Sequence, residues 1–152
     1  MGMQKLPITS LVELKVEARV NPSESPERVK TAVANVIQCT PEFRYGNKVI
    51  GKSFGGESLR SIYEQIRSRT AMGVLRRILL VNRVDNSTWF LLNKQAAATG
   101  IVVVVDDERE SPLGPVKVTI SCEEIDTLID WLVPSDMRNH MTRNSFPKPL
   151  KY

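Results

Sequence analysis

The chain has 152 residues, with 41% hydrophobic side chains, 25% charged side chains and a formal net charge of +4. This length suits one domain with a self-sufficient core, and both fractions are ordinary for a globular protein. The apolar runs are far too short to cross a membrane and residues 1–10 lack the apolar core of a signal peptide, so we expect a cytoplasmic protein with no membrane partner.

The first half of the chain predicts a strand followed by helices. Apolar and charged residues alternate over residues 11–20, as in a strand with one buried and one wet face. Ser25 and Pro26 suit the N-cap and the first position of a helix, and apolar residues follow them with a 3.6-residue period. The same period predicts helices over residues 57–69 and 71–82.

The region after these helices predicts a buried strand and a short helix. Residues 88–92 have the apolar composition of a buried strand. Asn93 is placed to cap a helix of residues 94–98, and Gly100 is placed to end it.

The last third predicts two more strands and a final helix. Residues 101–105 and 116–120 are β-rich runs, and we expect them to form a hairpin around an acidic loop. Ser121 and Glu124 have the spacing of a capping box. The helix that they introduce should end at Pro134, because proline cannot continue a helix.

A block in the second half of the chain carries a family resemblance. It reads Phe90-Leu91-Leu92-Asn93-Lys94-Gln95-Ala96-Ala97, then the valine run at 102–105, then Pro112-Leu113-Gly114-Pro115-Val116, with Asp130-Trp131-Leu132-Val133-Pro134 downstream. The chain resembles a family of small archaeal α/β proteins of uncharacterised function, whose fold is similar to that of large-subunit ribosomal protein five. The resemblance extends over residues 11–134 and implies this fold and an RNA-binding role, without an assigned reaction.

We predict a single α+β domain over residues 1–134, followed by a C-terminal arm over residues 135–152. The strand–helix units indicate a two-layer sandwich, with a mainly antiparallel sheet of four or five strands and the helices on one face. The arm has no apolar period and contains His140, the single histidine of the chain.

Residues 46–53 satisfy the phosphate-loop pattern G-x-x-x-x-G-K-S, with Lys52 at the lysine position. In a true phosphate loop a buried strand precedes the first glycine and a helix begins at the lysine. Here the preceding residues make a poor strand, and Phe54-Gly55-Gly56 prevents a helix from beginning at Lys52. We therefore interpret the segment as a glycine-rich loop around a short strand of residues 49–54.

Basic residues are concentrated in the middle of the chain. Residues 44–94 contain ten Lys/Arg and three Asp/Glu, a net charge of +7, whereas the rest of the chain carries −3. The arginines of the two central helices are Arg60, Arg67, Arg76, Arg77 and Arg83. Because the arginine fork matches phosphate geometry, we predict these five as RNA contacts.

The alternative for these arginines is a solvated or internally paired face. Arg60, Glu64 and Arg67 have the spacing of an ion-pair ladder that needs no ligand. No helix neighbour supplies a carboxylate to Arg76, Arg77 or Arg83, so the alternative is weaker for these three.

Asn93 and Lys94 follow a predicted buried strand. A helix that begins there would point free backbone amides and the Lys94 ammonium in the same direction. We therefore predict Lys94 as an RNA contact, and Lys52 and Asn93 as candidate anion-binding residues. The alternative is a strand-end turn in which residues 96–98 pack under the sheet and are more buried than Lys94.

Metal and catalytic sites find little support in the sequence. Two cysteines, one histidine and no Cys-x-x-Cys pair almost exclude a Cys/His metal site. Asp106, Asp107, Glu108 and Glu110 lack the spacing of a calcium loop. We expect no metal, no other cofactor and no catalytic residue.

The favoured function is binding of structured RNA, ribosomal or transfer, through phosphate contacts from the arginine-rich helical surface. A second hypothesis is a protein-interaction module or homodimer, with Val104, Trp131 or the C-terminal arm in the contact. A third is an enzyme for a small anionic substrate at Lys52 and the Asn93-Lys94 pair. Of these, the enzyme is the least favoured.

Overall fold

The structure is a computed structural model that describes residues 3–135. Its elements in chain order are β1 (Glu13–Arg19), α1 (Pro26–Val36), β2 (Glu42–Arg44), β3 (Lys48–Phe54), the 3-10 helix η1 (Gly56–Leu59), α2 (Arg60–Gln65), α3 (Arg69–Val81), β4 (Ser87–Leu92), α4 (Lys94–Ala98), β5 (Val104–Val105), the 3-10 helix η2 (Glu108–Glu110), β6 (Val116–Ser121) and α5 (Ile125–Leu132). The predicted C-terminal arm, apart from Ser135, lies outside the described residues, and so does His140.

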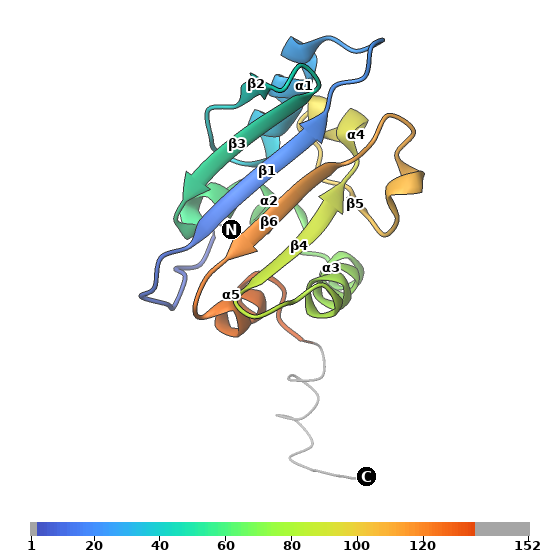
Figure 1. The fold of residues 1–152 in the computed structure, drawn as a ribbon. Helices are drawn as coiled ribbons and strands as arrows, with labels where there is room; N and C mark the ends of the chain where they lie inside the picture. Colours follow the sequence, from blue (N-terminus) through green and yellow to red (C-terminus); the bar gives the residue numbers. More distant parts are fainter. Residues whose placement is uncertain (1–2, 136–152) are drawn as a thin grey trace, which may run out of the picture.

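A six-stranded sheet forms one layer of the molecule, with the strand order β2-β3-β1-β6-β4-β5 and antiparallel pairing throughout. Figure 1 shows α1, α2 and α4 together behind the sheet, with α3 and α5 toward one end. The predicted α+β sandwich with helices on one face is therefore confirmed. The sheet has six strands, not four or five, because short edge strands of three and two residues complete it.

The alternation of buried and exposed side chains in β1 shows which side of the sheet the helices cover. Leu14 and Val16 are fully buried against the helices, whereas Lys15 and Arg19 point to the opposite side and are exposed. Directly paired residues of antiparallel strands share a side, so the register assigns the other strands in the same way. We call the side that carries Lys15 and Arg19 the open face; it faces the reader in Figure 1.

The hydrophobic core fills the space between the covered side of the sheet and the helices. Phe90 and Ile120 from the sheet, Leu75 from α3 and Leu128 from α5 are fully buried in it. Strands and helices from both halves of the chain therefore share one core.

The predicted hairpin of residues 101–105 and 116–120 is wrong. β5 consists of Val104 and Val105 alone and pairs with β4, while β6 lies between β1 and β4. The two runs are therefore separated by a strand that precedes both in sequence. Apolar periodicity identifies strands but does not say which strands pair, and this is why the prediction failed.

Helices begin close to their predicted positions. α1 begins at Pro26 with Ser25 before it, and α3 begins at Arg69, after the capping residue Ser68. The predicted helix over residues 57–69 is divided into η1 and the shorter α2. Within residues 3–135, no helix is both long and apolar enough to cross a membrane.

The predicted capping box before α5 does not form. The Ser121 hydroxyl hydrogen-bonds to the Ser87 hydroxyl at 3.2 Å. The Glu124 carboxylate accepts from the backbone amides of Ser10 and Thr9, at 3.0 and 3.1 Å, and these bonds lower its pKa. Glu124 thus fastens the segment before β1 to the start of α5.

Candidate nucleic-acid interface

The predicted arginine ladder on α2 forms only in part. Arg60 pairs with Glu64, as the ladder requires, and also with Glu57. The Arg67 guanidinium instead lies over the Tyr63 ring, with its Cζ atom 3.7 Å from the ring centroid, and donates to a backbone carbonyl at the end of α5. Burial lowers the pKa of Arg67. This side chain therefore belongs to the packing of α2 against α5.

The three arginines on and after α3 do have carboxylate partners, contrary to the prediction. The pairs are Arg76–Asp130 at 2.8 Å, Arg77–Asp106 at 3.1 Å and Arg83–Asp126 at 2.8 Å. The partners are 29 to 54 positions away in sequence and come from α5 and the loop after β5. Each pair is partly exposed and contributes little to stability, but it offsets the positive charge expected on this surface.

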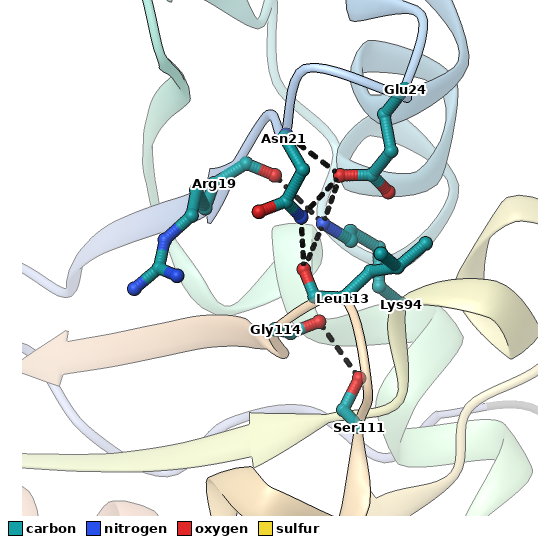
Figure 2. A network of polar contacts seen from close by, with 7 residues as sticks. All are labelled: Arg19, Asn21, Glu24, Lys94, Ser111, Leu113 and Gly114. Carbon is teal, nitrogen blue, oxygen red and sulfur yellow. Dashed lines mark hydrogen bonds and ion pairs between the residues drawn. The ribbon is translucent and has the colours of Figure 1, made fainter.

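Lys94 is buried and fully engaged in the network that Figure 2 shows. Its ammonium donates to the Arg19 carbonyl at 2.7 Å, the Glu24 carboxylate at 2.8 Å and the Leu113 carbonyl at 2.6 Å. Burial opposes the ionised form of Glu24, but hydrogen bonds from Lys94 and Asn21 outweigh it and lower the pKa. An ammonium has three protons, so Lys94 has none left for a phosphate. The prediction of Lys94 as an exposed RNA contact is wrong.

Asn93 caps α4, as predicted. Its side-chain oxygen accepts from the Ala96 amide at 2.8 Å. The expected order of burial is only partly right, because Ala97 is buried whereas Ala96 and Ala98 are more exposed than Lys94. The structure thus gives Asn93 a structural role at the start of the helix.

Lys52 lies within β3 and not at the start of a helix, as the interpretation of residues 46–53 predicts. Gly46, with a φ of 73°, lies in the turn before β3. Gly51 lies inside β3, where a Cβ atom would be 2.5 Å from the Sγ atom of Cys39. Lys52 and Lys94 line two separate hollows, so the pocket expected for an anionic substrate is not formed between them.

The open face gathers cations that the sequence did not single out. The register brings six basic and three acidic side chains to it: Lys15, Arg19, Arg44, Lys48, Lys52 and Lys117, with Glu13, Glu17 and Glu42. Lys15 pairs with Glu17 at 3.7 Å, and Arg44 pairs with Glu42. Within the described part of the chain, the side chains of Arg19, Lys48 and Lys52 have no carboxylate at ion-pair distance.

Two pairs of like charges lie directly opposite each other on β1 and β3. Lys15 faces Lys52, and Arg19 faces Lys48. Neighbouring strands are about 4.8 Å apart, and like charges in directly opposed positions destabilise the pairing. Lys15 and Lys52 also line a hollow of about 500 Å³ together with Arg44. An anion placed between two such cations is attracted by both of them, and this attraction offsets the repulsion between the cations.

The signal for this site was present in the sequence only in part. The wet side of residues 11–20 was recognised, but its charges alternate in sign: Glu13, Lys15, Glu17 and Arg19. The excess of cations arises once β3 lies beside β1, and that pairing was not predicted.

Relatives of the chain share most of its length. A UPF0201 protein from Methanothermobacter thermautotrophicus is 42% identical over 125 residues, which cover 80% of this chain and 91% of the relative. A UPF0201 protein from Sulfurisphaera tokodaii is 36% identical over 128 residues, covering 82% and 88%. The chain belongs to the archaeal UPF0201 family. A family model described as RNA binding matches residues 13–122 of this UPF0201 chain, so the family resemblance predicted from the sequence is confirmed.

Solved UPF0201 structures have the same fold. The structure from Methanococcus jannaschii is 29% identical and has a TM-score of 0.66, covering 81% of this chain and 93% of that chain. A second UPF0201 crystal structure, at 24% identity, has a TM-score of 0.68 and covers 81% and 94%. The RNA-binding match runs from the start of β1 to just past the end of β6, so it includes every strand of the sheet.

Proposed function

We propose that this protein binds structured RNA, ribosomal or transfer, through phosphate contacts on the open face. Membership of an RNA-binding family supports RNA as the class of partner. The proposal depends chiefly on the opposition of like charges, Lys15 to Lys52 and Arg19 to Lys48, on the side of the sheet away from the helices.

The physical reason is a repulsion that an anion relieves. Two unit charges 4 Å apart interact by about 1 kcal/mol in water and by more near a protein surface. Phosphate oxygens between two cations accept charge-assisted hydrogen bonds from both of them. Each neutralised phosphate also releases condensed counterions, which adds a favourable, salt-dependent contribution to binding.

The predicted helical contacts take second place in this proposal. Arg60, Arg77 and Arg83 are each paired with a carboxylate, which offsets the positive charge that would attract a phosphate. Arg67 and Arg76 also donate to backbone carbonyls, which ties them to the fold. Because these charges are already offset, we assign the main contacts to the open face.

A protein-interaction module or homodimer is the second candidate. Trp131 does not support it, because the side chain is buried and its N–H donates to the Gln4 carbonyl. Three exposed apolar side chains around the end of α3 do favour it: Leu80, Val81 and Val84. A molecular mass that rises with protein concentration in the wild type, but not in Val81→Asp, would support this candidate.

RNA affinity measured against salt concentration tests the proposed function. One phosphate for each cation of the two opposed pairs predicts a log–log slope of about −3 to −4, at roughly −0.7 to −0.9 per contact. Phosphate contacts do not read bases, so a transfer RNA and a ribosomal RNA fragment of similar size should bind alike. No measurable binding to either RNA at low salt would contradict the proposal.

A further inference from the structure

Trp89 lies on the open face in line with two of the cations. The register across β4, β6, β1 and β3 places Trp89, Thr119, Lys15 and Lys52 in one row. At about 4.8 Å per strand, the backbone positions of Trp89 and Lys15 are about 10 Å apart along this row. An aromatic side chain and an opposed pair of cations therefore lie within the span of a short stretch of RNA.

Trp89 is partly exposed on the open face and is not part of the core. Its neighbours Thr88 and Phe90 are fully buried on the covered side, whereas Trp89 is only partly buried. The N–H of the other tryptophan, Trp131, donates to a backbone carbonyl. The indole N–H of Trp89 donates no hydrogen bond to any residue between 3 and 135, which is typical of a ring edge that faces water.

A groove of about 230 Å³ borders this ring. Its lining includes Val81, Trp89, Leu91 and Val105, with Arg77 and Asp106 paired at 3.1 Å. The Lys117 ammonium lies over the Trp89 ring, 4.7 Å from the ring centroid, and is not among the residues that line the groove. The groove thus combines an aromatic wall and apolar side chains with polar groups, which suits a flat, uncharged ring that carries hydrogen-bonding groups at its edge.

We propose that Trp89 and this groove bind the base of an unpaired nucleotide in the RNA whose phosphates lie on Lys15 and Lys52. This inference rests on the proposed function and specifies its ligand. Unpaired bases stack on aromatic side chains, whereas bases inside an A-form helix are stacked on each other and out of reach. The ligand is thus a structured RNA with a bulge, a loop or a single-stranded end. A protein partner would account for the groove but not for its alignment with the cations.

A comparison of two RNAs tests this inference: a blunt duplex, and the same duplex with a short single-stranded overhang. The wild-type protein is expected to prefer the overhang RNA and to show quenching of tryptophan fluorescence when it binds. In Trp89→Leu the preference should fall roughly tenfold and the quenching should disappear, because one stacked base is lost. Affinity for the blunt duplex should stay unchanged.

Phe54→Leu is the matched control, because Phe54 is another aromatic on the open face and is 59% exposed. It should keep the full preference. Trp89→Phe retains an aromatic ring and should keep part of the preference, which separates stacking from any loss of folding in Trp89→Leu. An unchanged preference in Trp89→Leu, or equal losses in Trp89→Leu and Phe54→Leu, would overturn the inference and leave the phosphate contacts intact. Failure of the wild type to bind either RNA would overturn the proposed function instead.

Discussion

Lys94 is a single side chain that joins its own helix, α4, to two distant parts of the chain, residues 19–24 and Leu113. Its ammonium connects the end of β1, the turn before α1 and the loop before β6 (Figure 2). Replacement by methionine keeps much of the volume but removes the cation that pairs with the Glu24 carboxylate and a donor to two carbonyls. Asn21 still donates to Glu24 and to the Leu113 carbonyl. We expect Lys94→Met to cost about 3–5 kcal/mol in the free energy of unfolding, measured in urea. Lys30→Met, at a partly exposed lysine on α1, should change it by less than about 0.5 kcal/mol.

The same ion pair makes stability depend on pH. The pKa of Glu24 is lowered from its ordinary value of 4.5, so the ionised carboxylate stabilises the fold above this value. The stabilisation is lost as the pH falls through the folded-state pKa. Glu24→Gln should therefore be less stable than the wild type at neutral pH, and the gap should narrow in acid. A gap of equal size at neutral and acidic pH would contradict this explanation.

Among the elements, α4 depends on its cap. It has five residues, and the Asn93 oxygen accepts from the Ala96 amide at its first turn. We expect Asn93→Ala to lower the free energy of unfolding by about 1 kcal/mol, and Asn93→Ser to restore most of it, because serine also caps. Identical melting curves for all three proteins would remove the capping role.

The ion pair between Arg83, just after α3, and Asp126 of α5 allows a test of whether RNA phosphates bind the helical surface or the open face. If Arg83 contacts phosphate, Arg83→Ala flattens the salt dependence of RNA binding by about one contact. If Arg83 only neutralises Asp126, the slope should stay the same and stability should change by less than about 1 kcal/mol. We expect the second result. A salt titration of the variant beside the wild type measures both slopes.

Elements with strong local patterns were predictable, and those set by distant partners were not. The alternation in β1 and the 3.6-residue period of α1 and α3 follow from local burial, so they were found close to their true bounds. The pairing of β5 with β4 depends on which strand edge is free. Glu124 has the spacing of a capping box, but its carboxylate is taken by amides that lie 114 and 115 positions earlier.

At the scale of the whole molecule, charge is divided between the two layers. The five arginines predicted as RNA contacts are engaged by carboxylates or carbonyls. Within residues 3–135, four cations of the open face have no carboxylate at ion-pair distance: Arg19, Lys48, Lys52 and Lys117. The basic middle segment of the sequence supplies only part of this face. Lys15, Arg19 and Lys117 lie outside that segment and reach the face because β1 and β6 lie beside each other in the sheet. A net charge counted along the sequence could not show this.

The most direct test compares two double variants of equal charge change by the salt dependence of their affinity for structured RNA. Lys15→Ala/Lys52→Ala removes an opposed pair from the open face, whereas Lys5→Ala/Lys30→Ala removes two lysines near the helices. The first variant should flatten the log–log slope by roughly 1.4 to 1.8, the equivalent of two phosphate contacts, and weaken all RNA sequences alike. The second should keep the wild-type slope. Equal slopes for the two variants would contradict binding of RNA phosphates on the open face.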